Sequence, residues 1–374
     1  LLRLDLNVPL DGDVITDTTR IDKILPTLEF LISQNSKIII ISHIGRPKGK
    51  VVNELSLGPA CKDLEIKLSQ NIKLISKNIK ELSSKDLFNS NDEKIVMLEN
   101  IRFYPEEEKN NQKFAKHLSA LADIYVNDAF SCSHRAHTSI HDIANFLPSY
   151  SGLQLDLEIN ALKKITSEIK KPITCIIGGS KVSTKINIIK NLIPKFDNII
   201  IVGGMANNII KYMGNNIGKS LQEENSDLII KEIFSLSETA SCKLTYPEDI
   251  VVGKDLNGKP QIKELNEISS DEMILDIGPR TINMISNIID ESNTILWNGP
   301  AGYFENPSFA NGSIEIAKKI IENNKINKIF SVAGGGDTVA LLNNLNAIND
   351  FNFISTAGGA FLEYLEGKEL PGIK

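Results

Sequence analysis

Hydrophobic residues occur along the chain in short continuous runs that alternate with segments of helical periodicity. Apolar runs bounded by Gly, Pro or polar residues are typical of strands buried on both faces of a parallel sheet. We expect such strands at residues 1–6, 38–42, 95–98, 124–126, 173–177, 199–202, 294–297 and 329–332. One apolar run per unit, alternating with helical patterns, predicts an α/β fold built on doubly wound, mainly parallel sheets.

The length of 374 residues suggests about two domains. After "NFLPSYSG", residues 153–165 carry apolar positions at helical spacing and are followed by Lys170, Lys171 and Pro172. We interpret this segment as a helix that links two Rossmann-like domains. The predicted organisation is an N-terminal domain at 1–152, the linking helix at 153–165 and a C-terminal domain from residue 166 onward.

Composition narrows the class of protein. The formal net charge of −6 and the 41% of hydrophobic residues are ordinary for a soluble globular chain. Nucleic acid is not an expected partner because there is no basic excess, and no apolar run approaches the roughly 18 residues of a membrane helix. The four widely spaced cysteines predict reduced thiols in a cytoplasm. Because the chain begins with Leu1 inside a predicted strand, we expect a missing N-terminal segment.

The arginines are few and unevenly distributed. Of 41 basic residues only six are Arg, and five of these, with all five histidines, lie in the first 141 residues. Arg grips carboxylate or phosphate with a planar fork that Lys cannot copy. The first half is therefore a candidate site for a small anion, although scattered surface ion pairs would also account for a few arginines.

The stretch "SKIIIISHIGRPKGK" gives that site a position. A buried strand runs directly into His43, Arg46 and neighbouring lysines and glycines. In parallel sheets, ligands bind just beyond the carboxyl ends of the strands. The cluster follows a strand in that position, and its charges indicate an anionic small molecule.

Glycine-rich loops distinguish the second half. They are "IIGGSKVSTK", "IIIVGGMANN", "LDIGPRT", "WNGPAGYFE", "SVAGGGDTVA" and "STAGGAFLE". Glycine after a strand lets the backbone approach a phosphate closely, although each loop alone could be ordinary turn chemistry. Asp337 is positioned to hold Mg²⁺ on such phosphates, and Lys181 and Lys185 offer positive charges unless they are simply a solvated helix face. No loop fits a dinucleotide fingerprint or a Walker loop.

In order along the chain, nine segments resemble the motifs of the phosphoglycerate kinase family. They are "RLDLNVPL", "ITDTTRI", "SHIGRPKG", "LENIRFYPEEEKN", "NDAFSCSHRAHTS", "GGSKVSTK", "WNGPAGYFE", "AGGGDT" and "STAGGAFLEYLEGKELPG". The resemblance implies a monomeric cytoplasmic kinase of glycolysis and gluconeogenesis, with a carboxyl group as acceptor. It would transfer a phosphoryl group between 1,3-bisphosphoglycerate and MgADP, giving 3-phosphoglycerate and MgATP. It also implies hinge closure, a C-terminal domain that ends at 354, and a segment, 355–374, that returns to the first domain.

Motif by motif, the resemblance assigns residues to two binding sites. The substrate-binding residues that it implies are Asp5, Asn7, Arg20, His43, Arg46, Arg102 and Arg135, with His134 and His137 as weaker candidates. The nucleotide-binding residues that it implies are Gly179, Ser180, Lys181, Lys185, Gly204, Leu275, Asn298, Pro300, Glu305, Gly335, Gly336, Asp337 and Thr338. Arg20 and Lys181 would be catalytic, and Asp337 would hold Mg²⁺.

The implied reaction needs no general base. Its acceptor in the reverse direction is a carboxylate, which is already ionised at pH 7, so alignment and charge neutralisation remain as the catalytic tasks. Two alternatives stay open from the sequence. One is a nicotinamide-dependent dehydrogenase on two Rossmann-like domains, and the other is a non-catalytic nucleotide-binding or scaffolding protein.

Overall fold

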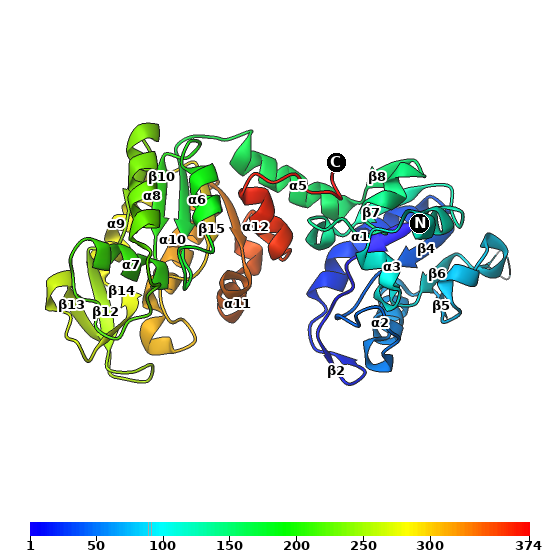
Figure 1. Ribbon diagram of the computed structural model, residues 1–374, viewed down its shortest axis with the longest axis horizontal. Coiled ribbons are helices and arrows are strands. Elements are labelled where there is room, and N and C mark those ends of the chain that lie inside the picture. Colours follow the sequence, from blue (N-terminus) through cyan, green and yellow to red (C-terminus); the bar gives the residue numbers. More distant parts are fainter. Residues whose placement is uncertain (89, 91) are drawn as a thin grey trace. The chain divides into compact units, whose positions relative to one another are not determined.

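The computed structural model describes residues 1–88, 90 and 92–374, which divide into two compact units. Unit 1 comprises Leu1–Asn160 and Glu369–Lys374, and unit 2 comprises Ala161–Lys368 (Figure 1). Helix α5 (Leu153–Thr166) contributes residues to both. Within the described residues, no helix is both long and apolar enough to cross a membrane.

Unit 1 is built on a six-stranded sheet in which every neighbouring pair is parallel. In spatial order its strands are β5 (Ile72–Ile75), β6 (Ile95–Leu98), β4 (Ile38–Ile41), β1 (Leu2–Leu4), β7 (Tyr125–Asp128) and β8 (Ser149–Ser151). The other elements are the hairpin strands β2 (Leu10–Asp11) and β3 (Val14–Ile15), and the helices α1 (Thr19–Ser33), α2 (Gly58–Leu68), α3 (Pro105–Glu108) and α4 (Gln112–Ser119).

The continuous apolar runs form strands here because both faces of this sheet are covered. Successive side chains of a strand point to opposite faces. Ile38 and Ile40 therefore pack in one core with residues of α1 and α2, whereas Ile39 and Ile41 pack in another with Phe114 of α4. A strand with two buried faces has no polar alternation, which is the pattern of "IIII".

Unit 2 repeats this architecture with its own six-stranded parallel sheet. In spatial order the strands are β11 (Lys243–Thr245), β10 (Asn198–Ile201), β9 (Ile173–Ile177), β15 (Thr294–Asn298), β16 (Phe330–Gly334) and β17 (Phe353–Ser355). The helices are α6 (Ile186–Leu192), α7 (Gly204–Tyr212), α8 (Asp227–Ala240), α9 (Pro279–Glu291), α10 (Asn311–Lys325), α11 (Gly336–Asn344) and α12 (Gly359–Leu365).

A second, antiparallel sheet belongs to unit 2 and was not predicted. Its strands are β13 (Gln261–Glu264), β12 (Asp249–Gly253) and β14 (Met273–Ile277), and Figure 1 shows them beside α7. Ile210 of α7 packs against Ile250 and Val252 of β12 in a small core. Strand β13 gave no signal because it is polar and largely exposed, whereas β12 and β14 do carry apolar runs that were not recognised as strands.

The eight predicted strands and the α/β class with two mainly parallel sheets are confirmed, with bounds that shift by at most two residues. The edge strands β5, β8, β11 and β17 were missed. Edge strands are short and pair on one side only, so their sequences carry a weaker signal.

The C-terminal return to unit 1 begins later than predicted. The prediction was residue 355, but residues up to Lys368 belong to unit 2. Helix α12 packs against α6, where Asn191 Nδ2 donates to Leu365 O at 2.7 Å. Only the last six residues join unit 1, where Gly372 N donates to Ser133 O at 2.9 Å.

The start of α5 is tied to unit 1 by a buried aspartate. Asp128 Oδ1 accepts the Leu155 amide at 2.8 Å, and its Oδ2 accepts the Thr27 hydroxyl at 2.6 Å. Thr27 Oγ1 in turn accepts the Leu153 amide at 3.0 Å. Gly152 precedes the helix, and a Cβ there would lie 2.3 Å from the Asp128 carboxyl carbon. These contacts satisfy the first amides of α5 in place of its own side chains.

Candidate active site

The predicted substrate residues of unit 1 lie beyond the carboxyl ends of neighbouring strands. The strands β6, β4, β1 and β7 are adjacent, so the residues after them meet at one edge of the sheet. We call these seven residues the anion patch: Asp5 and Asn7 after β1, Arg20 in the first turn of α1, His43 and Arg46 after β4, Arg102 after β6 and Arg135 after β7.

Arg20 is fixed by a carboxylate yet stays accessible. Its Nη1 lies 2.7 Å from Asp5 Oδ2, and its side chain is 32% exposed. Ser131 Oγ donates to the same carboxylate oxygen, while Asp5 Oδ1 accepts the Asn7 amide at 3.1 Å. Asp5 therefore holds the guanidinium in a defined orientation without burying it.

The loop after β4 is held between two members of the anion patch. Asn7 Oδ1 accepts the Gly45 amide at 2.8 Å, and Arg102 Nη1 donates to Gly45 O at 2.9 Å. Gly45 has φ +63°, and a Cβ there would lie 2.7 Å from the Leu55 side chain, so this position requires glycine. The next residue, Arg46, is exposed.

Arg102 and Arg135 supply buried and partly buried positive charge. Arg102 is 5% exposed, and burial, together with the charges of Arg3 and Arg135, lowers its pKa. Its Nε is a buried nitrogen without a hydrogen-bond partner among the described residues and lies 3.7 Å from Glu108 Oε1. A buried donor without an acceptor is costly, and an anionic ligand would satisfy it.

Two histidines of this region, His43 and His137, are polar but uncharged at neutral pH. Burial and then the charge of Arg3 hold the pKa of His43 well below its ordinary value. Burial and the charge of Arg102 lower the pKa of His137 to about 4. The positive charge of the patch therefore comes from its arginines, and this corrects the interpretation of His43 as a cationic member.

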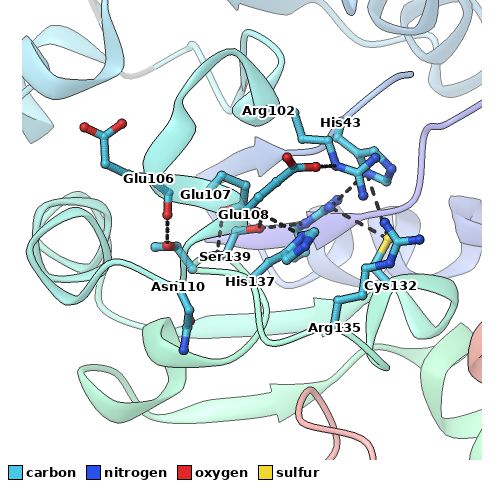
Figure 2. A network of polar contacts seen from close by, with 12 residues as sticks. His43, Arg102, Glu106, Glu107, Glu108, Asn110, Cys132, Arg135, His137 and Ser139 are labelled. Carbon is cyan, nitrogen blue, oxygen red and sulfur yellow. Dashed lines mark hydrogen bonds and ion pairs between the residues drawn. The ribbon is translucent and has the colours of Figure 1, made fainter. Parts of the chain in front are cut away.

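Sequence reasoning missed Arg3. The side chain of Arg3 is fully buried, and its Nη2 lies 3.0 Å from His43 Nδ1. Its position on β1, two residues before Asp5, puts both on one face of the strand, which is the signal that could have found it. Figure 2 shows Arg102, Arg135 and Cys132 gathered around His43, with Glu107, His137 and Ser139 beside them.

The predicted nucleotide residues of unit 2 occupy the corresponding edge of the second sheet. The adjacent strands β10, β9, β15 and β16 end there. The following segments carry Gly179, Ser180, Lys181 and Lys185 after β9, Gly204 after β10, Pro300 and Glu305 after β15, and Gly335, Gly336, Asp337 and Thr338 after β16. Asn298 is the last residue of β15, and Leu275 lies on the antiparallel strand β14.

One pocket gathers seven of these residues. It is lined by Gly179, Ser180, Gly204, Leu275, Pro300, Glu305 and Asp337. Its remaining wall is mostly apolar and includes Ile210, Leu221, Ile250 and Phe304, none of which was predicted. These residues look like ordinary core positions in the sequence, so no local signal distinguishes them.

Lys185 is enclosed by backbone and amide oxygens. Its Nζ donates to Asn298 Oδ1 at 2.5 Å, to Gly178 O at 2.5 Å and to Asn298 O at 3.2 Å. Burial lowers its pKa to about 8. The alternative that Lys185 belongs to a solvated helix face is therefore wrong, whereas Lys181 is exposed.

The loops around this pocket approach one another too closely for side chains. Gly299 has φ +110°, and a Cβ there would lie 2.3 Å from Gly178 O. Gly335 has φ +96°, and its Cβ would lie 2.8 Å from Asn298 Nδ2. Thr338 Oγ1 accepts the Gly299 amide at 2.7 Å and ties the loop after β15 to α11. Glycine at these positions permits the close packing of strand ends that forms the pocket.

The chemistry of Asp337 fits a magnesium ion. Its carboxylate lies exposed in the first turn of α11 and lines the pocket. Mg²⁺ is commonly held by one or two carboxylates, with phosphate oxygens and water completing its octahedron. A single accessible carboxylate that lines the pocket suits that arrangement.

A second group of potential metal ligands, in unit 1, does not suit a cation. Ligand atoms of Asp5, His43 and Cys132 lie within 4.8 Å of one another. However, Asp5 is paired with Arg20, and Arg3 Nη2 lies 3.9 Å from the Cys132 sulfur. Burial raises the pKa of the Cys132 thiol, so it is not a thiolate at neutral pH. Arginines already occupy the position in which a metal would supply charge.

Comparison with known proteins gives consistent matches over both units. A family model described as phosphoglycerate kinase matches residues 1–368. The phosphoglycerate kinase of Zymomonas mobilis is 42% identical over 376 residues, which cover 100% of this chain and 95% of that protein. The corresponding protein of Wolbachia pipientis is 44% identical over 376 residues, with the same coverage.

Solved structures agree with these matches. The phosphoglycerate kinase of Coxiella burnetii superposes with a TM-score of 0.93 at 36% identity, covering 100% of this chain and 94% of that one. The enzyme of Pyrococcus horikoshii superposes with a TM-score of 0.80 at 28% identity and the same coverage. The similarity therefore extends over the anion patch and the glycine-rich loops alike.

Proposed function

The chain belongs to the phosphoglycerate kinase family, and on this basis we propose how its two groups of residues carry out the reaction of that family. The reaction is reversible phosphoryl transfer from 1,3-bisphosphoglycerate to MgADP, giving 3-phosphoglycerate and MgATP, in glycolysis and gluconeogenesis. The observation that carries the proposal is that one chain holds two groups of residues beyond the carboxyl ends of its parallel strands. The group in unit 1 is rich in arginine, and the group in unit 2 is rich in glycine.

The decisive experiment is a coupled assay for ATP formation from 1,3-bisphosphoglycerate and MgADP. We expect product formation that requires both substrates. A nicotinamide-dependent dehydrogenase would instead change the absorbance of its cofactor without ADP, and a scaffolding protein would give no product. Either result would overturn the proposal.

In unit 1, the anion patch would bind 3-phosphoglycerate. Arg102 supports this role because its buried Nε forms no hydrogen bond within the described structure, although Glu108 Oε1 lies 3.7 Å away. Arg20 would neutralise the phosphoryl group in transfer, since it is oriented by Asp5 and still accessible. Arg46 and Arg135 would add bidentate contacts to the phosphate, and Asn7 and His43 would donate or accept hydrogen bonds.

In unit 2, the predicted residues would bind the nucleotide. The apolar part of the pocket, with Leu275, would take the base, and Glu305 would take the ribose. The amides of the glycine-rich loops and the N-terminus of α11 would receive the phosphates, with Lys181 and Lys185 adding charge. Exposed Lys181 would reach the transferred group, and half-buried Lys185 would remain nearer the nucleotide.

No proton has to be removed for this reaction. The acceptor carboxylate of 3-phosphoglycerate is ionised at pH 7, so the protein has to align the reactants and neutralise a loose transition state. Arg20 and Lys181 are the groups proposed for that task. Asp337 would hold Mg²⁺, which when bound would supply positive charge to neutralise the nucleotide phosphates.

Removal of the Asp337 charge should weaken nucleotide binding selectively. We expect Asp337→Asn to raise the dissociation constant for MgADP by about tenfold, because a neutral amide is a poorer magnesium ligand. Binding of 3-phosphoglycerate should be unchanged, since its residues belong to unit 1. Calorimetric titration of each ligand measures both effects, and an equal loss for the two ligands would contradict the assignment.

Because the two ligands would bind to different units, transfer requires that they be brought together. The reacting atoms must come within about 3–3.5 Å, with water excluded from the phosphoryl group. We propose hinge-bending closure through α5 and the residues near Ser355–Gly359. Small-angle scattering should give a smaller radius of gyration with MgADP and 3-phosphoglycerate together than with either alone. The same radius of gyration in the free protein, with each ligand alone and with both ligands would refute closure.

We also propose that the protein acts as a cytoplasmic monomer. Four buried free cysteines support a reducing compartment. Sedimentation of the purified chain with and without substrates tests the oligomeric state, and a dimer at micromolar concentration would refute it.

A further inference from the structure

The contact between Arg3 and His43 determines which ring nitrogen of His43 carries its proton. Arg3 Nη2 lies 3.0 Å from His43 Nδ1. A guanidinium has five N–H donors and no acceptor, so the hydrogen bond can form only if Nδ1 accepts. The proton of the neutral ring must then lie on Nε2, the other nitrogen.

Arg3 is held firmly enough to impose this choice. It is fully buried, and its Nε donates to Ser139 Oγ at 3.0 Å. Its Nη1 donates to Leu4 O and lies 3.4 Å from Ser42 Oγ. Both the strand that carries Arg3 and the segment that carries Ser139 therefore fix the guanidinium against His43.

A buried carboxylate balances the charge of Arg3. Glu107 is fully buried, and its Oε1 accepts the Ser139 hydroxyl at 2.7 Å, while its Oε2 accepts the Ser139 amide at 2.9 Å. The Ser139 hydroxyl thus accepts from Arg3 and donates to Glu107. A continuous chain of hydrogen bonds runs from Glu107 through Ser139 and Arg3 to His43, and Figure 2 shows its labelled members.

The other groups around His43 also disfavour a second proton. Arg102, Arg20 and His137 all act on its ring electrostatically in the same direction as Arg3. The sulfur of Cys132 lies 3.9 Å from Nδ1 as a neutral thiol. Asp5, whose carboxylate oxygens lie near the ring, is already paired with Arg20.

We propose that Arg3, balanced by Glu107, is a positioning residue that fixes His43 as a neutral ring with its proton on Nε2. His43 then offers the bound anion one N–H donor whose state does not change over the physiological pH range. This inference rests on the proposed function only for the identity of the anion as 3-phosphoglycerate. Arg3 and Glu107 would act on substrate binding through His43 and would not contact the substrate themselves.

The unmodified protein provides the first test. In protein labelled with ¹⁵N-histidine, long-range ¹⁵N–¹H spectra distinguish a protonated from an unprotonated ring nitrogen. We expect His43, assigned by its loss in His43→Ala, to show unprotonated Nδ1 and protonated Nε2 from pH 5.5 to 8.5. His141, whose side chain is 37% exposed, gives a comparison signal. A His43 ring protonated on Nδ1, or one that titrates within this range, would overturn the proposal.

A double variant tests the role of Arg3. Arg3→Met/Glu107→Gln removes both buried charges together, which avoids leaving either one unpaired. The unmodified protein, which keeps Arg3 beside His43, is the control. We expect His43 to titrate or to populate both tautomers in the double variant but to keep the Nε2–H pattern in the control. The same His43 spectrum in both proteins would show that Arg3 does not set the tautomer.

Binding gives the functional readout. We compare the dissociation constants for 3-phosphoglycerate of the double variant and the control as a ratio. This ratio should fall by up to about tenfold from pH 8 to 5.5, because His43 of the double variant would become cationic and attract the anion. Using the ratio cancels the titration of the substrate phosphate. A constant ratio would refute the positioning role. Failure of the proposed function would appear differently, as absence of binding by the unmodified protein.

Discussion

Arg20→Ala should lower kcat by about 10²–10³-fold while changing the affinity for MgADP little. The side chain is partly exposed and oriented by Asp5, so it is free to meet charge that develops on the transferring phosphoryl group. Interactions that strengthen only in the transition state affect kcat, whereas uniform binding affects KM. Steady-state kinetics with both substrates varied separates the two.

The matched control is Arg280→Ala. Arg280 is the arginine of unit 2, and its exposed side chain pairs with Glu264 at 2.6 Å. Exposed ion pairs contribute little, so kcat should stay within about twofold of the original value. A near-normal kcat with raised KM in Arg20→Ala would make Arg20 an ordinary binding residue.

Lys185→Ala should weaken MgADP binding by about 10²-fold, because the positive charge proposed to act on the nucleotide phosphates is lost and the oxygens of Gly178 and Asn298 are left without their donor. Lys185 precedes α6, and its enclosure by Gly178 and Asn298 oxygens means that no lysine of that helix can replace it. Lys190→Ala is the matched control, since Lys190 lies on α6 and pairs with exposed Glu232 at 2.6 Å. Calorimetry should show an unchanged dissociation constant for that control.

Lys185 also predicts that MgADP affinity and folding stability change in opposite directions as pH rises. The pKa of Lys185 is lowered to about 8 by burial, so MgADP affinity should fall as pH rises above 8 and the charge is lost. The unfolded chain holds this proton up to about pH 10.4. Between these values the unfolded state binds more protons, so this lysine makes stability rise with pH. An affinity that is flat from pH 7.5 to 9.5 would contradict the role of Lys185.

The central strands were predictable because their environment is simple. A strand such as β4, with "IIII" buried on both faces, needs no partner information to be recognised. The polar strand β13 and the short edge strands depend on their neighbours for pairing, and their sequences do not encode that context. Leu275 was proposed as a nucleotide-binding residue from the family resemblance alone, and the strand that carries it, β14, was not predicted.

In the candidate site, too, some residues could be predicted from the sequence and others could not. Charged and glycine residues after strands could be proposed as site residues because their chemistry is unusual at those positions, and the family resemblance supplied the rest. The apolar wall of the pocket, such as Ile210 and Ile250, was not found because it looks like core. Arg3 was missed because a lone cation within "LLRLDLN" gives no sign of its buried partner Glu107, which is 104 positions away.

Helix α5 makes the two units hard to separate by truncation. Its first residues are held by Asp128 and Thr27 of unit 1, whereas Leu162 and Ile165, both fully buried, belong to unit 2. A fragment ending before the helix would leave the Asp128 carboxylate buried without its amide donors. A fragment ending after the helix would expose Leu162 and Ile165 to water. An isolated half of this enzyme therefore needs a redesigned helix end as well as a new terminus.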